Sequence, residues 1–214
     1  RGKRDGRSTL WLTPEEKEEE KFFKNGKLDG PSTFWNNGFR KTMTTYKSDS
    51  PEGPWVIWYS DSDQMKEQGF HQEGIREGLT TYYYEEGTMQ REGFFKEGLP
   101  DGIWTYWNSK GEKDFDFDFG TGLQHIELED LAERESIFYK IGDERPFTGI
   151  ITQENPEADY LFLGRTKEGK KDGQWVKWFP DGKDVPEIIL VDVPQPEPKM
   201  PWSGGKQEQG GYKE

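Results

Sequence analysis

The stretch Gly169-Lys-Lys-Asp-Gly173-Gln-Trp175-Val-Lys-Trp178 decides the fold, because its two glycines and the aromatic residues after them recur along the chain. From Gly6, the second glycines of the next four copies follow at steps of 24, 23, 25 and 24 residues. A nearly constant period of this length is the signature of a repeat protein. The glycine pairs are Gly2/Gly6, Gly26/Gly30, Gly74/Gly78, Gly98/Gly102 and Gly169/Gly173, and Gly53 and Gly149 are second glycines of degenerate copies.

Each repeat unit reads as strand, turn, strand, turn. Aromatic and β-branched residues favour strands, and glycine allows the positive φ that tight turns need. The return segment of each unit carries such residues, as at Phe22, Tyr46, Phe70 and Phe94. The residue five positions after the second glycine is aromatic in every clear copy: Trp11, Trp35, Trp58, Tyr83, Trp107 and Trp178.

A single hairpin is only marginally stable in water, so successive hairpins must stack edge to edge. We therefore expect an all-β protein, an elongated and twisted antiparallel sheet of tandem hairpins of about 24 residues each. Such an array should have no deep core, because its aromatic rows mostly contact their neighbours. The exposed edges of the sheet make self-association a further expectation.

The spacing of the repeats divides the chain into four parts. Residues 1–120 form a first array, and residues 121–147 form a connecting segment with a short helix over 126–136. Residues 148–193 form a second, shorter array that ends in a strand, and 194–214 are an extended or flexible tail. The aromatic row and glycine turn are missing from residues 151–162, which leaves open whether 121–165 continue the sheet. Thr13-Pro14-Glu15-Glu16 resembles a helix start, but its register favours a tight turn.

Composition excludes several classes of partner. The chain is 30% hydrophobic and 33% charged, and its net charge of −13 repels phosphate backbones and anionic headgroups. We therefore expect no nucleic-acid binding, and the lack of a long apolar run predicts no membrane insertion. The chain starts without Met and inside a repeat, which suggests that an upstream segment was removed. The compartment stays open between a bacterial cytoplasm and, if that segment was an export signal, the periplasm or cell surface.

No motif predicts catalysis, a metal or a cofactor. His71 and His125 are the only histidines, no cysteine is present, and neither a zinc-ligand spacing nor a nucleophile elbow appears. Asp114-Phe-Asp-Phe-Asp118 alternates acid and ring, which predicts a strand with one acidic and one aromatic face. A solvated face is favoured there over a calcium site. A glycosidase-like pair of carboxylates ranks last among the hypotheses, because a thin open sheet rarely forms a cleft.

The pattern Gly-x-x-x-Gly-x-Trp-x-x-Trp, complete at residues 169–178 and again at 98–107, is similar to the variant MORN repeat of bacterial YwqK-type antitoxins. The resemblance covers roughly residues 1–120 and 145–185. It implies an elongated hairpin array without enzymatic activity. It also implies a role as the antitoxin or immunity partner of a secreted toxin.

The sequence thus supports a non-catalytic protein-binding repeat protein. Its acidic surface would attract a basic partner, such as a toxin that degrades nucleic acid. The alternative is a carbohydrate or cell-wall binding module whose exposed rings stack on sugars. The candidate partner-binding residues are Trp35, Trp58, Tyr83, Trp107 and Trp178, although packing between repeats is the competing role for these rings.

Overall fold

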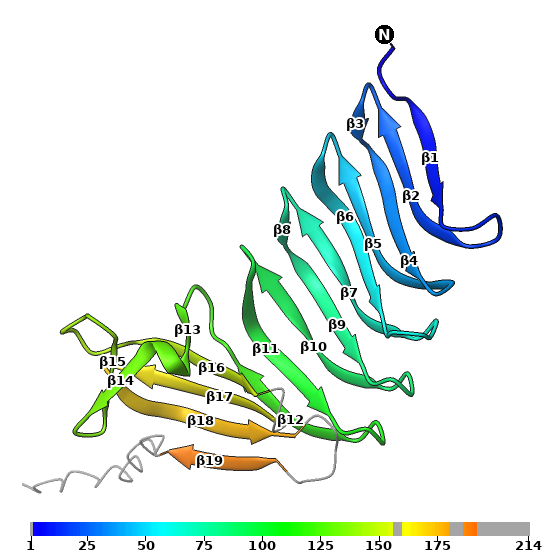
Figure 1. Ribbon diagram of the computed structural model, residues 1–214. Helices are drawn as coiled ribbons and strands as arrows, with labels where there is room; N and C mark the ends of the chain where they lie inside the picture. The colour runs from blue at the N-terminus through cyan, green and yellow to red at the C-terminus, as the bar shows by residue number, and fades with distance from the viewer. Residues whose placement is uncertain (1, 156–159, 180–185, 192–214) are drawn as a thin grey trace, which may run out of the picture.

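The computed structural model describes residues 2–155, 160–179 and 186–191 of the chain, and these are organised almost entirely as β-strands. The expected fold class is confirmed: the protein is all-β, and consecutive hairpins form one long, open antiparallel sheet (Figure 1). This first sheet runs in the order β1-β2-β4-β5-β6-β7-β9-β10-β11-β12, with β3 and β8 at hairpin tips. Its strands are β1 (Gly6–Trp11), β2 (Lys17–Lys24), β3 (Lys27–Leu28), β4 (Gly30–Asn36), β5 (Phe39–Lys47), β6 (Ser50–Trp58), β7 (Met65–Gln72), β8 (Ile75–Arg76), β9 (Gly78–Tyr83), β10 (Met89–Lys96), β11 (Leu99–Trp107) and β12 (Lys113–Asp118).

A second sheet lies beside the end of the first (Figure 1). Its order is β13-β16-β17-β18-β19, and it is antiparallel except for the parallel pair β13 and β16. A small hairpin of β14 and β15 forms a third sheet. The bounds are β13 (His125–Glu127), β14 (Leu131–Arg134), β15 (Ile137–Lys140), β16 (Gly149–Asn155), β17 (Tyr160–Lys167), β18 (Lys170–Trp178) and β19 (Glu187–Val191). The tail predicted for 194–214 lies outside the described residues.

The structure forms turns at both places where the sequence resembles a helix. In place of the helix over 126–136, the chain forms β13, a single 3-10 turn at Leu128–Asp130, and then β14. The helix cannot form because Glu135 and Ser136 both have positive φ and reverse the chain, which pairs 131–134 with 137–140. Thr13 does accept the backbone N–H of Glu16 in the manner of a helix cap, but the segment is the turn between β1 and β2.

The tip turns hold successive repeats together. We use this name for the five turns Asn25–Gly26, Ser48–Asp49, Glu73–Gly74, Glu97–Gly98 and Glu168–Gly169, in which both residues have positive φ, the geometry that matches the twist of a hairpin. In each of them, the second residue donates its backbone N–H to a carbonyl of the preceding repeat, two positions before that repeat's second glycine. The donor and acceptor residues are Gly26 and Arg4, Asp49 and Leu28, Gly74 and Pro51, Gly98 and Arg76, and Gly169 and Phe147, at 2.7 to 3.1 Å.

A side chain of the preceding repeat accepts the other N–H of most tip turns. Glu73 donates to Glu52 at 2.8 Å, and Glu97 donates to Glu77 at 2.9 Å. Because the accepting residue stands directly before the second glycine, the sequence carried a signal that we had missed. That residue is acidic in six copies: Asp5, Asp29, Glu52, Glu77, Asp101 and Asp172.

The last tip turn also fixes the repeat register in the second sheet. Glu168 donates its N–H to the Thr148 hydroxyl at 2.8 Å, and Gly169 donates to Phe147. Thr148 and Phe147 occupy the two positions before Gly149, where an acid and a carbonyl acceptor stand in the first sheet. Gly149 is therefore the second glycine of a repeat, and β16 and β17 continue the hairpin pattern.

The tip-turn contact predicts a graded loss in Glu77 variants. Glu77→Ala removes the acceptor of the Glu97 N–H and should lower the free energy of unfolding by about 0.5–1.5 kcal/mol. Glu77→Gln keeps an oxygen acceptor and should lose less. Urea denaturation and the hydrogen-exchange rate of the Glu97 amide measure both effects. Equal losses in the two variants, or unchanged exchange at Glu97, would contradict the assignment.

A buried core lies where the second sheet packs on β10, β11 and β12, so the expectation that the array has no deep core is wrong at this end. Tyr106 stacks on Phe115 with ring centroids 4.5 Å apart, and both meet Trp178 of the second sheet edge-on. The buried cluster consists of Tyr84, Phe95, Trp104, Tyr106, Phe115, Phe117, Phe119, Ile150, Leu161, Leu163, Val176 and Trp178. The other face of the second sheet forms a smaller cluster with Phe138 and Phe147.

Three tryptophans occupy space that a glycine on the neighbouring strand leaves open. Trp55 pairs directly with Gly69, and Trp175 pairs with Gly164. A Cβ at Gly164 would lie 2.6 Å from the indole of Trp175, and one at Gly93 would overlap the ring of Trp104. None of these glycines has positive φ, so space rather than backbone conformation requires them.

A double-mutant cycle tests this requirement. Gly93→Ala alone should destabilise the protein by about 1–3 kcal/mol, because an extra methyl group must displace a buried ring. In a Trp104→Ser background, which copies the residue at position 32 of an earlier repeat, the same change should cost almost nothing. Thermal or urea unfolding of the four proteins gives the coupling. A cost that is the same in both backgrounds would contradict steric exclusion by Trp104.

Candidate functional site

The two faces of the first sheet have different surroundings. Trp104, Tyr106 and Phe117 lie on the face that the second sheet covers at β10–β12, which we call the inner face. Because side chains alternate along a strand, Thr105 and Trp107 lie on the opposite, outer face. The Asp114–Asp118 strand follows the expected alternation, with Phe115 and Phe117 buried inside and Asp116 and Asp118 exposed outside.

The predicted aromatic residues of the first sheet form one row on the outer face, near the ends where adjacent repeats turn. Each ring pairs across the strands with a cation or a methionine. The pairs are Trp11 with Lys17, Trp35 with Arg40, Trp58 with Met65, Tyr83 with Met89, and Trp107 with Lys113. The row therefore alternates rings with long side chains through five repeats.

Packing between repeats occupies much of this row. The Lys17 ammonium lies 5.6 Å from the ring centre of Trp11 and 5.3 Å from that of Trp35, while the Arg40 guanidinium lies 4.9 Å from Trp58. Such cation–ring contacts stabilise neighbouring hairpins. Trp58 is only 8% exposed, whereas Trp35, Tyr83 and Trp107 are half-buried.

The tyrosine that directly follows a residue of the aromatic row links two repeats, because its hydroxyl donates to the backbone carbonyl of the row residue in the following repeat. Tyr59 donates to the Tyr83 carbonyl at 2.6 Å, and Tyr84 donates to the Trp107 carbonyl at 2.7 Å.

Trp178 does not join the outer row. It is 1% exposed, packs against Tyr106 and Phe115, and donates its indole N–H to Asp114 at 3.1 Å. The reason is that the corresponding face of the second sheet, with Val176 and Trp178, is turned toward the first sheet. A partner therefore has no direct access to Trp178, and Trp58 is also buried, whereas Trp35, Tyr83 and Trp107 remain partly exposed.

An exposed apolar stripe, which sequence reasoning missed, also crosses the outer face. We define the stripe as Pro54, Phe70, Leu79, Phe94 and Ile103, which come from the successive strands β6, β7, β9, β10 and β11. Pro54 pairs with Phe70, and Leu79 pairs with Phe94. The side chains of Phe70, Leu79, Phe94 and Ile103 are 44%, 46%, 56% and 64% exposed. The signal was present, since the residue after the second glycine is apolar in four successive copies: Pro31, Pro54, Leu79 and Ile103.

A polar row lies between the apolar stripe and the aromatic row. Cross-strand pairs connect Gln68 to Thr81, Thr81 to Glu92, Glu92 to Thr105, and Thr105 to Asp116. Hydrogen bonds from Lys113 and Thr105 lower the pKa of Asp116, which keeps this carboxylate ionised. The end of the stripe that carries Phe94 and Ile103 therefore adjoins the acidic residues Glu92, Asp116 and Asp118.

A second candidate site is a cleft on the inner face, beside the second sheet. Arg76 donates to the Tyr82 hydroxyl at 2.9 Å and pairs with Glu67 at 3.3 Å. The Arg91 guanidinium lies 4.2 Å from the ring centre of Tyr82 and bonds Glu154 of the second sheet at 3.4 Å. These five residues border a cavity of about 340 Å³.

The phenol of Tyr82 is neutral in this cleft. Burial raises the pKa of Tyr82, so its phenol stays neutral and acts as a hydrogen-bonding group rather than a base. Among the described residues, no group of three or more His, Asp or Glu side chains is placed to hold a metal ion. His71 instead packs on Trp55, and His125 stacks on Phe119.

The two histidines predict a pH dependence of stability. Burial lowers the pKa of His71 and His125 below the usual 6.5, and the charge of Arg76 lowers that of His71 further. The unfolded chain therefore binds more protons than the folded one below this pH. The free energy of unfolding should fall as the pH decreases from about 7 to about 5.5. A His71→Gln, His125→Gln protein should show a flatter profile in urea titrations, and an unchanged slope would refute this origin.

The described residues contain no helix that is long and apolar enough to cross a membrane.

Comparison with known proteins adds no assignment. Neither the scan against protein-family models nor the search of curated proteins found a match to this chain.

Proposed function

We propose that the protein is a non-catalytic binding protein whose outer face docks a basic partner protein. The observation that carries this proposal is the apolar stripe, because contiguous exposed apolar side chains on a soluble protein commonly mark an interaction site. Phe94 and Ile103, its two most exposed members, lie on the adjacent strands β10 and β11 with more than half of each side chain exposed.

The charges beside the stripe select the partner. Glu92, Asp116 and Asp118 stand next to its most exposed end, and the net charge of −13 creates a long-range field that attracts cations. An apolar centre with a charged rim is the usual composition of a protein–protein interface. The preferred partner is therefore a protein with an apolar patch inside a basic surface. The resemblance to YwqK-type antitoxins suggests a secreted toxin of this kind.

An affinity capture with the 214-residue chain as bait tests the proposal. The variant is Phe94→Ser, Ile103→Ser, and both changes lie at exposed positions that the fold does not require. The matched control is Leu10→Ser, Leu12→Ser, which removes two exposed apolar side chains at the far end of the array. We expect one basic protein to be captured from the native source by the wild type and the control. The stripe variant should bind it at least about tenfold more weakly, equivalent to about 1.4 kcal/mol.

Salt and sugar arms distinguish the competing explanations. Raising the ionic strength should weaken capture, because the Debye length shrinks from about 10 Å at 0.1 M to about 3 Å at 1 M. If the stripe variant binds the partner as strongly as the wild type does, the aromatic row becomes the candidate binding surface. Trp35→Ala and Trp107→Ala then test that row. Capture of cell-wall polysaccharide without any protein would overturn the proposal in favour of a carbohydrate-binding module.

A further inference from the structure

The first array ends with a pair of acceptors that no tip turn occupies. In earlier repeats, the carbonyl two positions before the second glycine receives an N–H group of the next tip turn, and in most of them the side chain one position before that glycine receives the other. Pro100 and Asp101 hold these two positions before Gly102. No tip turn in the described residues donates to either of them.

Within the described part of the chain, no tip turn reaches Pro100 and Asp101 because the chain does not form another hairpin of the first sheet after β12. Gly102 instead donates its N–H to the Gly120 carbonyl, and Phe119 donates to Gly102, both at 2.9 Å. The Asp118 carboxylate accepts the N–H of Gly120 at 2.8 Å and closes a bend. The following residues then pass into the second sheet.

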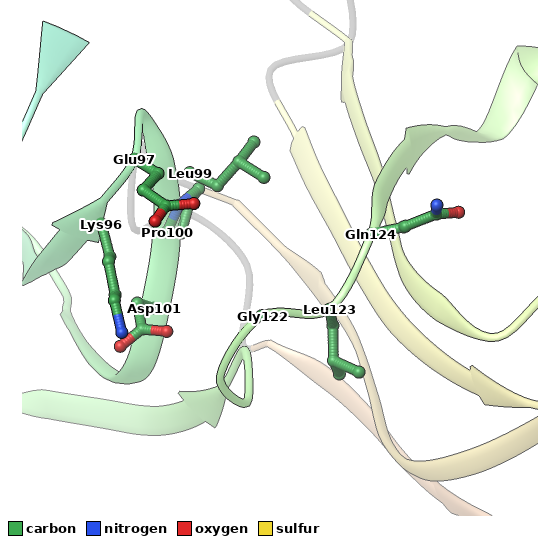
Figure 2. A pocket seen from close by; sticks show the side chains of 8 residues that line it. All are labelled: Lys96, Glu97, Leu99, Pro100, Asp101, Gly122, Leu123 and Gln124. Carbon is green, nitrogen blue, oxygen red and sulfur yellow. The ribbon is translucent and has the colours of Figure 1, made fainter.

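A cavity of about 380 Å³ opens at this place. Figure 2 shows Glu97, Leu99, Pro100 and Asp101 at the tip of the β10–β11 hairpin on one side of it. The segment with Gly122, Leu123 and Gln124 borders the other side. A volume of this size lies within the ~300–1,000 Å³ range of sites that hold small ligands.

One wall of the cavity is equivalent, by repeat position, to a surface that binds a tip turn elsewhere in the same molecule. The preceding tip turn, Glu97–Gly98, is held by Arg76 and Glu77 through bonds of 3.1 and 2.9 Å. Pro100 and Asp101 follow the same two-residue pattern one repeat later. The surface that bears them is therefore already shaped for a two-residue turn with positive φ at both residues.

We propose that this cavity binds the turn of a β-hairpin from a partner protein, with the Asp101 carboxylate and the Pro100 carbonyl accepting two consecutive backbone N–H groups. Each of the five tip turns in the described residues already donates an N–H group to the preceding repeat, and the occupant is therefore assigned to a partner protein. The proposal rests on the proposed function in one respect, namely that the partner is a protein, but it places a second contact on acceptors beside the Phe94 end of the apolar stripe, since Asp101 is the cross-strand partner of Phe94.

The chain's own turns define the chemistry of the occupant. Four of the five tip turns end in glycine, preceded by Asn or Glu, and one of the four, Glu97–Gly98, belongs to the hairpin that forms the cavity wall. Lysine precedes the turn at Lys24, Lys47, Lys96 and Lys167. A Lys-Glu-Gly or Lys-Asn-Gly turn therefore supplies both N–H donors and a cation that suits the Asp101 carboxylate.

An NMR titration of the full chain tests this binding site. The probe is a head-to-tail cyclised hairpin peptide whose turn copies Lys96-Glu97-Gly98-Leu99. We expect saturable amide shifts at Asp101, Gly122, Leu123 and Gln124. A control peptide with N-methylglycine in place of the turn glycine lacks one donor and should bind at least about tenfold more weakly.

Variants of the chain locate the acceptor. Asp101→Ala should weaken binding at least about tenfold, and Asp101→Asn should weaken it less, because its amide oxygen still accepts. Glu133→Ala, which removes an exposed carboxylate elsewhere, is the matched control and should bind as the wild type does. Asp101 has no side-chain bond to another described residue, so its variants should keep the wild-type amide spectrum.

Several results would overturn the proposal: no saturable shift, equal binding of the N-methylglycine peptide, or full binding by Asp101→Ala. Concentration-dependent dimerisation of the wild type that Asp101→Ala abolishes would also overturn it, since the occupant would then be a second copy. The proposed function is tested separately. Phe70→Ser, Leu79→Ser changes two stripe residues on β7 and β9 that do not pair with Asp101, and it should leave the peptide titration unchanged while it weakens capture of the partner protein.

Discussion

The hydrogen bond from each tip turn to the preceding repeat is the contact on which the array depends. It joins one backbone to another, so it requires a turn with positive φ and a properly placed carbonyl but no particular side chain. This explains why degenerate repeats still stack. Ser48–Asp49 replaces the usual glycine turn and keeps the bond to Leu28, and Thr148 replaces the usual acid and keeps the bond to Glu168. The spacing of the repeats is therefore kept along the chain even where the residue types at equivalent positions differ.

Sequence periodicity predicted the elements well because hairpins are local. The glycine steps, the strands between them and the outer aromatic row of the first sheet all follow from contacts between residues one repeat apart. The core was not predictable in this way. Val176 and Trp178 show the same spacing as Thr105 and Trp107, yet the first pair is buried and the second lies on the outer face. Burial depends on where the second sheet docks, through contacts such as Trp178 to Asp114, 64 positions apart.

Docking of the second sheet gives the two faces of the first sheet different roles. On the inner face, β10–β12 use their rings for the core, and the cleft with Arg91 and Glu154 marks where this coverage stops. On the outer face, none of the described residues forms a second layer over the same strands. Phe94 is the outward neighbour of buried Phe95, and Ile103 is the outward neighbour of buried Trp104. Apolar residues at such outward positions gain nothing from the fold, which is why the stripe is better explained by a partner than by stability.

Acidic residues serve two separate purposes, so the net charge overstates what a partner meets. Glu52 and Glu77 accept turn N–H groups and are part of the repeat architecture. Asp116 and Asp118 lie on the outer face, where the fold makes fewer demands on them. A partner attracted only by the net charge would bind along the whole array. The outward-facing acids Asp116 and Asp118 and the most exposed apolar residues coincide on β10–β12, the end of the array at which the unoccupied acceptors of Asp101 and Pro100 also lie.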